Sequence, residues 1–144
     1  MRYKSLVIEV PLVQEAEGPT TQCAGDIYEL VRRDLVDLAQ ETVLVITLTQ
    51  KNKVIERHVL GVGTLTECMV HPRDVFRHAI MDNAAAIAIV HNHPTGDPAP
   101  SRGDRMLTTR LKECADLMGI RLIDHVIVGK GKYYSFAEAG ALGS

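Results

Sequence analysis

Residues 85–104 read AAIAIVHNHPTGDPAPSRGD, and this stretch decides the fold that we predict. Its first part, residues 85–90, is a short and fully apolar run of the kind that forms a central strand. A loop rich in proline, glycine and aspartate follows. Residues 102–118 then show the apolar periodicity of a helix, which Gly119 ends. The stretch therefore predicts a buried strand that passes through a tight loop into a helix.

The segments on either side predict the remaining elements. Apolar residues that recur at steps of three and four indicate helices, and runs rich in β-branched residues indicate strands. A polar turn joins the first two strands as a β-hairpin, which Gly61 and Gly63 end. The expected helices cover about 24–40 and the segment from Pro72, and the expected strands cover 42–49, 54–60, 120–128 and 133–136. This order predicts one α/β (α+β) domain with helices packed against a mixed sheet.

The composition is that of a globular domain. The chain has 144 residues, of which 46% are hydrophobic and 24% charged, and its net charge of −2 offers no global field to attract nucleic acid. Three cysteines without a CxxC pair favour reduced thiols and a cytoplasmic location. Glu9 and Pro11 break the apolar run 5–13, so neither a signal peptide nor a membrane span is expected. We assign 1–23 to an N-terminal strand and loop extension and 24–144 to the domain.

A candidate metal site lies in the central stretch. Residues two apart in an extended chain point to the same side, so His91 and His93 can converge on one ion while Asn92 faces away. The loop can then reverse the chain and bring Asp104 to the same point. Two histidines and one carboxylate suit zinc and leave a fourth position for water. Other interpretations stay open: the histidines can be ordinary core or surface residues, and Asp104 stands three residues after Ser101, as in a capping box.

At this point the residues resemble a known family. His91-x-His93, seven residues, Ser101, two residues and Asp104 match the JAMM (MPN+) metalloprotease motif HxH-x7-S-x2-D at every position. The flanking stretches GTLTECMVHPRDVFRHAIMDNAAAIAIV and LIDHVIVG are similar to the RadC family of bacterial JAB-domain proteins, and the resemblance covers about residues 24–138. It implies a single JAB/MPN-like domain of cytidine-deaminase-like fold with one Zn²⁺ per chain, bound by His91, His93 and Asp104.

The resemblance also implies residues that act beside the metal. A glutamate is expected to work through the metal-bound water, and we favour Glu41 because it immediately precedes the first strand of the hairpin. Glu56, within the second strand, is the alternative, and Glu41 can instead be a plain helix-end or loop carboxylate. Ser101 is implied to donate a hydrogen bond to the oxyanion. For Asp124 and His125, which lie in a matching strand, a structural role is favoured over one beside the site or the substrate.

The resemblance implies a zinc-dependent hydrolase whose activated water attacks an amide bond, peptide or isopeptide, in a protein or peptide substrate. The alternative is a DNA-repair-associated accessory or nucleic-acid-transaction domain with a metal site, because RadC proteins carry a DNA-repair label. The negative charge and the lack of an aromatic and basic stripe give DNA little support.

The chain is also expected to lack the N-terminal helix-hairpin-helix-like region of full-length relatives. A purely structural metal is a third interpretation, but such sites normally close with four protein ligands and we find three. The sequence predicts neither the identity of the substrate nor the oligomeric state.

Overall fold

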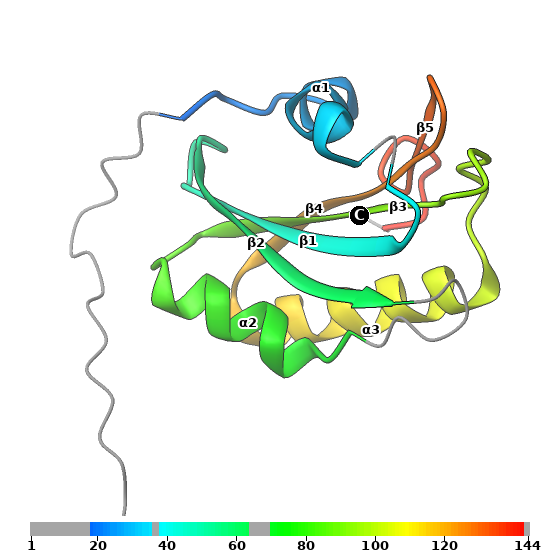
Figure 1. The fold of residues 1–144 in the computed structure, drawn as a ribbon. Helices are drawn as coiled ribbons and strands as arrows, with labels where there is room; N and C mark the ends of the chain where they lie inside the picture. The colour runs from blue at the N-terminus through cyan, green and yellow to red at the C-terminus, as the bar shows by residue number, and fades with distance from the viewer. Residues whose placement is uncertain (1–17, 36–37, 64–69, 143–144) are drawn as a thin grey trace, which may run out of the picture.

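The computed structural model describes residues 18–35, 38–63 and 70–142 of the chain (Figure 1). These residues form a single α+β domain, which confirms the predicted fold class and the predicted order of elements. The helices and strands within them are α1 (Ala24–Leu35), β1 (Glu41–Leu48), β2 (Val54–Gly63), α2 (Pro72–Met81), β3 (Ala86–Asn92), α3 (Arg102–Met118), β4 (Arg121–Val128) and β5 (Tyr133–Ser135).

The five strands form one mixed sheet in the order β2-β1-β3-β4-β5. Strand β1 pairs antiparallel with both β2 and β3, while β3 and β4 run parallel and β5 returns antiparallel to β4. A parallel pair needs a crossover connection, and α3 supplies it between β3 and β4. The loop before α3 therefore starts at the carboxyl end of the central strand, where the candidate site residues lie.

Helices cover both faces of the sheet (Figure 1). On one face, α1 packs against Leu44 and Ile46 of β1, and on the other, α2 and α3 pack against Val43 and Val45. Every residue of β1 and of β3 is consequently buried. This double coverage explains why both strands are nearly continuous apolar runs rather than alternating ones.

Two element boundaries differ from the prediction. Helix α1 ends at Leu35 rather than near Gln40, and Leu38, which has the spacing of a core residue, is 40% exposed. The prediction carried the helix too far because Leu38 is apolar and has helical spacing, although it lies beyond the part of the helix that packs on the sheet. Strand β2 continues past Gly61 to Gly63, because both glycines pair with residues of β1. Gly61 therefore does not end the strand, and Gly63 is its last residue.

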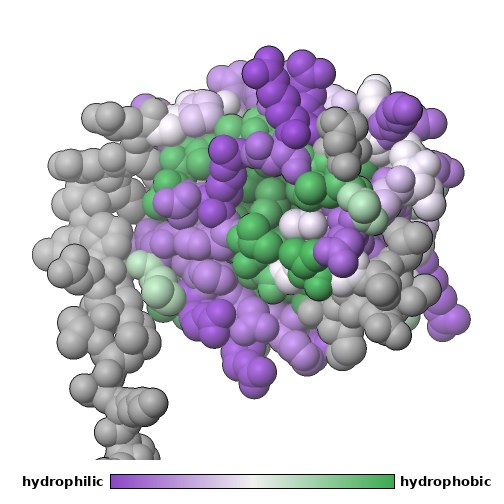
Figure 2. All heavy atoms as spheres, viewed as in Figure 1, coloured by the Kyte–Doolittle hydropathy of each residue, from purple (hydrophilic) through white to green (hydrophobic). Residues whose placement is uncertain are grey.

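The strand-like run at 5–13 lies outside the described residues. The described part of the N-terminal segment runs beside the β1–β2 turn, where Thr20 bridges Lys53 and the Val54 amide donates to the Pro19 carbonyl. Apolar side chains gather near the centre of the face shown in Figure 2, over the sheet edge formed by β2, and hydrophilic side chains surround them. Val59 and Val62 are the exposed apolar residues of that strand. Among the described helices, none has the length and apolarity needed to cross a bilayer.

Candidate metal centre

The carboxyl end of β3 places two imidazoles side by side. His91 lies within the strand and His93 directly after it, and their Nε2 atoms are 3.1 Å apart. Between them Asn92 points away, where its Oδ1 accepts the Thr42 amide at 2.7 Å and its Nδ2 donates to the Gln40 carbonyl at 3.1 Å. The expected alternation is therefore present. The intervening residue has its own structural task, because it fastens the start of β1 to β3.

The loop after His93 is held against the β4–β5 turn. The His93 amide donates to the Val128 carbonyl, and the Lys130 amide donates to the Gly96 carbonyl, each at 2.9 Å. A Cβ atom on Gly129 would overlap the Gly96 carbonyl oxygen, so only glycine permits this close approach. Because the loop is fixed at these points, the direction of the His93 ring and the start of α3 are fixed with it.

The first turn of α3 positions the carboxylate. Ser101 is the N-cap: its Oγ accepts the Asp104 amide at 3.1 Å, and its own amide donates to Asp104 Oδ2 at 2.8 Å. The predicted capping box is thus present. The same carboxylate places Oδ1 at 3.1 Å from His91 Nε2 and Oδ2 at 3.1 Å from His93 Nε2. Capping and contact with both imidazoles occur together, so the two interpretations of Asp104 do not exclude each other.

The structure separates the two candidate glutamates. Glu41 is the first residue of β1, is only 6% exposed, and has its Oε1 at 3.4 Å from His91 Nε2. Glu56 is an exposed residue of the edge strand β2, pairs with Thr47 rather than with the start of β1, and turns its Oε1 back to the Arg57 amide. The structure therefore brings Glu41 to the histidines and leaves Glu56 away from them.

Four residues with metal-ligating atoms meet at this point. One donor atom from each of Glu41, His91, His93 and Asp104 lies within 4.8 Å of the others. His91 Nε2 lies 3.4 Å from Glu41 Oε1, and each imidazole Nε2 lies 3.1 Å from an Asp104 oxygen, close to the ~3.3 Å edge of a tetrahedron with zinc–nitrogen bonds of about 2.0–2.1 Å. Nitrogen and carboxylate donors at this spacing fit a divalent ion such as zinc. The task of each residue toward the ion stays a prediction.

The buried charges of the cluster shift one another's pKa values. Burial raises the pKa of the Glu41 carboxyl above its ordinary range, although the two imidazoles oppose this. Burial also favours the neutral form of Asp104, but its hydrogen bonds with His91 and His93 outweigh that effect and hold its pKa well below the usual range. The hydrogen bond to Asp104 raises the pKa of His93 in turn. Asp104 is therefore the fixed anion of the cluster, and Glu41 is the carboxylate that protonates more easily.

A hydrogen-bonded chain runs from the cluster into the core. His91 Nδ1 lies 2.7 Å from His125 Nε2, His125 Nδ1 lies 2.6 Å from Thr108 Oγ1, and Thr108 Oγ1 donates to the Asp104 carbonyl at 2.8 Å. Both His91 and His125 are at most 2% exposed. Burial lowers the pKa of His125 well below its ordinary value, so this imidazole is neutral.

Thr108, the last residue of this hydrogen-bonded series, fixes the tautomers of His125 and His91. A carbonyl oxygen can only accept, so the single hydroxyl hydrogen of Thr108 is committed to Asp104. The Thr108 oxygen then accepts Nδ1–H of His125, whose Nε2 accepts Nδ1–H of His91. A neutral His91 is then left with a lone pair on Nε2 for an ion, whereas without the ion Nε2–H makes the hydrogen bond to Asp104. For His93, Nδ1 donates to the Asp97 carbonyl at 3.0 Å, so a neutral ring would also present the lone pair of Nε2 to an ion; without the ion, Nε2–H donates to Asp104 at 3.1 Å.

The sequence analysis did not predict the hydrogen bonds that join His91, His125 and Thr108. It favoured a purely structural role for His125 and did not single out Thr108. One signal was present, since Thr108 stands four residues after Asp104 and so lies on the same side of α3. The contact between His91 and His125 depends instead on how β3 and β4 pair, and nothing in the local sequence reports that. The buried Asp124 accepts bonds from Ser135 and from the backbone, which is the structural role expected for it.

A cavity of about 810 Å³ opens beside the cluster, and Glu41, Ser101 and Asp104 are among the residues that line it.

The domain, with its mixed sheet and its candidate metal centre at the end of the central strand, is of the JAB/MPN-like class. A family model described as the RadC-like JAB domain matches residues 21–141. The chain therefore belongs to the RadC family, as the resemblance of its motifs indicated.

The curated relatives agree with this membership. A UPF0758 protein of Clostridium perfringens is 49% identical over 118 residues, which are 82% of this chain and 52% of the relative. A UPF0758 protein of Pelobacter propionicus is 47% identical over 81% of this chain and 51% of its own length. The protein lmo1549 of Listeria monocytogenes is 44% identical over 91% and 58%, respectively. The chain thus spans about half the length of the curated relatives that it matches.

Proposed function

We propose that this domain is a zinc-dependent hydrolase of the JAMM type that cleaves amide bonds, in a peptide or an isopeptide linkage. The observation that supports it most is the group of Glu41, His91, His93 and Asp104, whose ligating atoms lie within 4.8 Å of one another beside an open cavity. Its residues match the motif of JAMM metalloproteases, and the cavity gives a substrate access to them.

Three residues would hold the ion: His91 and His93 through Nε2, and Asp104 through its carboxylate. When bound, zinc lowers the pKa of a coordinated water to about 7 and polarises a carbonyl group. Three protein ligands leave a position for that water, as catalytic zinc sites require. The capping box holds Asp104, the His91–His125–Thr108 hydrogen bonds hold His91, and the Asp97 carbonyl holds His93, so the three donors are in place before the ion arrives and the cost of ordering them is lower.

Glu41 would move the proton. It takes a proton from the attacking water as the water oxygen adds to the amide carbon, and it delivers that proton to the leaving nitrogen as the carbon–nitrogen bond breaks. Burial raises the pKa of its carboxyl, which makes it a stronger base than an exposed glutamate. A positioned general base of this kind contributes about 10²- to 10⁴-fold to the rate.

Ser101 would stabilise the negative oxygen formed on the amide carbon. Its Oγ already accepts the Asp104 amide, so the hydroxyl hydrogen is directed elsewhere and can be donated to the substrate. Ser101 also lines the cavity beside Glu41 and Asp104. One side chain thus caps α3 and offers a donor at the site, which connects the stability of the helix to the chemistry.

The test compares two glutamate variants and one ligand variant. Zinc content and cleavage of a mixed quenched-fluorescent peptide library, with an isopeptide-linked substrate in parallel, are measured for Glu41→Gln, Glu56→Gln and His91→Ala. We expect Glu41→Gln to keep zinc and lose about 10²- to 10⁴-fold in rate, Glu56→Gln to match the parent, and His91→Ala to lose zinc. Full turnover by Glu41→Gln would refute the assignment of the base. Cleavage that is unaffected by removal of zinc would refute the proposed function.

A further inference from the structure

The cavity beside the metal centre extends along α3. Its lining includes residues of that helix from Ser101 to Glu113, together with Val70 and His71 before and at the N-cap of α2. At 1.5 Å of rise per residue, the distance along the helix from Asp104 to Glu113 is about 14 Å. This length accommodates about four residues of an extended peptide. We call this lined space the α3 groove.

Three arginines give the α3 groove a local positive charge. Arg102, Arg105 and Arg110 line it, are exposed, and form no ion pair within the described part of the chain. The remaining basic residue of α3, Lys112, is neutralised by Asp116 at 2.6 Å. Apart from the two acids of the metal cluster, the groove lining contains one acid, Glu113. A chain with a net charge of −2 thus has unpaired cations beside its candidate metal centre.

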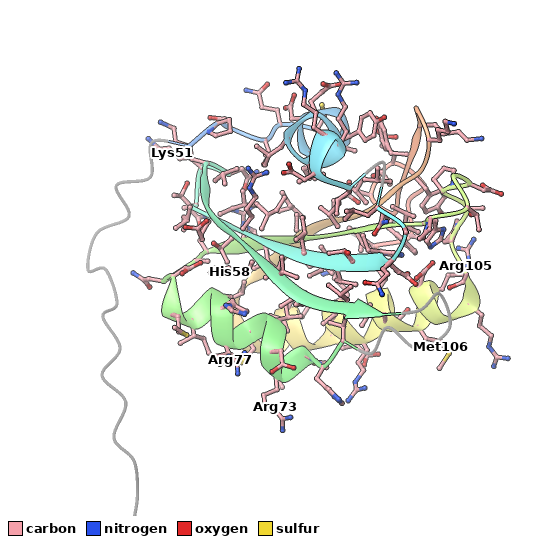
Figure 3. All side chains as sticks on the ribbon, in the orientation of Figure 1. Lys51, His58, Arg73, Arg77, Arg105 and Met106 are labelled. Atoms are coloured by element: carbon pink, nitrogen blue, oxygen red, sulfur yellow. The ribbon has the colours of Figure 1, made fainter. Side chains whose placement is uncertain are left out.

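The groove also has an apolar part. Met106 is 62% exposed, although it is a large hydrophobic residue, and Leu107 beside it is half-buried. Figure 3 shows Arg105 and Met106 at the N-terminal end of α3, so a charged and an apolar side chain are neighbours there. The described lining contains no Phe, Tyr or Trp on which a base could stack. These features fit a peptide with acidic and aliphatic side chains better than a nucleic acid.

We propose that the α3 groove binds the part of a peptide substrate that carries carboxylate side chains next to the bond to be cleaved. The inference rests on the proposed hydrolase function for the position of that bond. An arginine guanidinium is always charged and matches a carboxylate with two parallel hydrogen bonds. Each exposed arginine–carboxylate pair is expected to change affinity by about two- to five-fold. Met106 and Leu107 would receive an aliphatic side chain between the acids.

The experiment measures binding separately from cleavage. Three fluorescein-labelled peptides of equal length, in which leucine alternates with glutamate, glutamine or lysine, are titrated with the zinc-treated full chain carrying Glu41→Gln. A single-stranded oligothymidine serves as a fourth probe. Fluorescence anisotropy is recorded at low and high salt, because pairs between exposed charges weaken as salt screens them. We expect the glutamate peptide to bind tightest and to lose its advantage at high salt.

Matched arginine variants locate the binding. Arg105→Gln with Arg110→Gln should weaken the glutamate peptide by about four- to twenty-five-fold, if the two effects add. The control is Arg73→Gln on α2, an exposed arginine that lies outside the groove lining and forms no ion pair within the described residues (Figure 3). It should leave binding unchanged.

Three outcomes would overturn the inference: equal binding of the glutamate and glutamine peptides, an equal loss with the control variant, or oligothymidine as the tightest probe with that binding lost in the double variant. The last result would assign the groove to nucleic acid.

A cleavage measurement distinguishes this inference from the function on which it rests. If the glutamate peptide binds through Arg105 and Arg110 but the parent chain cleaves no amide, the inference about the α3 groove is supported and the proposed hydrolase function is refuted. If the parent chain cleaves glutamate and glutamine peptides at equal rates and depends on Glu41, the hydrolase stands and the groove inference fails. Faster cleavage of the glutamate peptide, lost in the arginine double variant, supports both.

Discussion

Thr108→Val tests whether the hydrogen-bonded chain behind His91 prepares the metal centre. Valine has nearly the shape of threonine but lacks the hydroxyl, so the substitution removes one polar group and creates almost no cavity. In the structure that hydroxyl accepts Nδ1–H of His125 at 2.6 Å and donates to the Asp104 carbonyl at 2.8 Å. The carbonyl keeps its ordinary helical partner. The imidazole loses the acceptor that the structure gives its Nδ1–H.

The expected magnitude follows from burial. His125 is fully buried, and an unsatisfied buried donor costs about 1–3 kcal/mol. The His125 ring can avoid this cost by moving its hydrogen from Nδ1 to Nε2. His91 Nδ1 must then accept that hydrogen, so the hydrogen of His91 moves to Nε2 and points into the cluster. That tautomer cannot bind zinc. The penalty therefore appears in zinc affinity, at about 10- to 100-fold, the usual effect of losing a group that orients a metal ligand.

The assay combines affinity with a direct reading of the tautomer. Zinc affinity is measured by competition with a chromophoric chelator, and the ring nitrogens of metal-free protein are observed by ¹⁵N NMR. The parent should show Nδ1–H on both His91 and His125. Thr108→Val should weaken zinc binding and either shift His125 towards Nε2–H or lower the free energy of unfolding by about 1–3 kcal/mol.

The adjacent residue provides the control. Thr109 makes the same kind of contact, with its hydroxyl donating to the Arg105 carbonyl at 3.0 Å, but it is exposed and remote from the imidazoles. Thr109→Val should leave zinc affinity and both tautomers unchanged. The reasoning is refuted if Thr108→Val, like Thr109→Val, binds zinc as tightly as the parent and shows the same ring spectra. The hydrogen bonds from Thr108 through His125 would then have no part in preparing His91.

Three further predictions follow from local contacts. Gly129→Ala should lower stability by about 1–3 kcal/mol in urea unfolding, because a Cβ would overlap the Gly96 carbonyl oxygen; an unchanged midpoint would contradict this close approach. Ser101→Ala removes the N-cap of α3 and should cost about 1 kcal/mol by thermal unfolding, and no loss would show that the cap is dispensable. Burial and the stacked His58 lower the pKa of His78, so the folded state resists protonation and stability should fall as pH drops below about 6.5. His78→Asn should flatten that dependence, and an equally steep urea midpoint profile in the variant would count against it.

The elements of the fold were predictable because both faces of the sheet are covered. Burial on two sides imposes continuous apolar runs on β1 and β3, and packing on one side imposes the periodicity of the helices. The end of α1 was not predictable from spacing, since Leu38 has a core position in the pattern but is exposed in the fold. The extension of β2 past Gly61 to Gly63 depends on pairing with β1, which composition does not reveal.

The candidate site was predictable to the extent that it is local. Strand alternation predicted that His91 and His93 share one side, and the serine–aspartate spacing predicted the capping box of Ser101 and Asp104. Glu41 needed the family resemblance, because its approach to His91 joins two strands that are distant in sequence. His125 was weighed for a role beside the site but given a structural one. Its contact with His91 is fixed only by the register of β3 against β4.

The central claim is that the end of β3 and the start of α3 form an open zinc site. The most direct measurement is a crystal structure of zinc-saturated protein with anomalous data at the zinc edge. We predict one ion per chain, bound by Nε2 of His91, Nε2 of His93 and a carboxylate oxygen of Asp104, with a water in the fourth position within hydrogen-bond reach of Glu41. An ion at another place, no ion at all, or a fourth position filled by a protein atom would contradict the account.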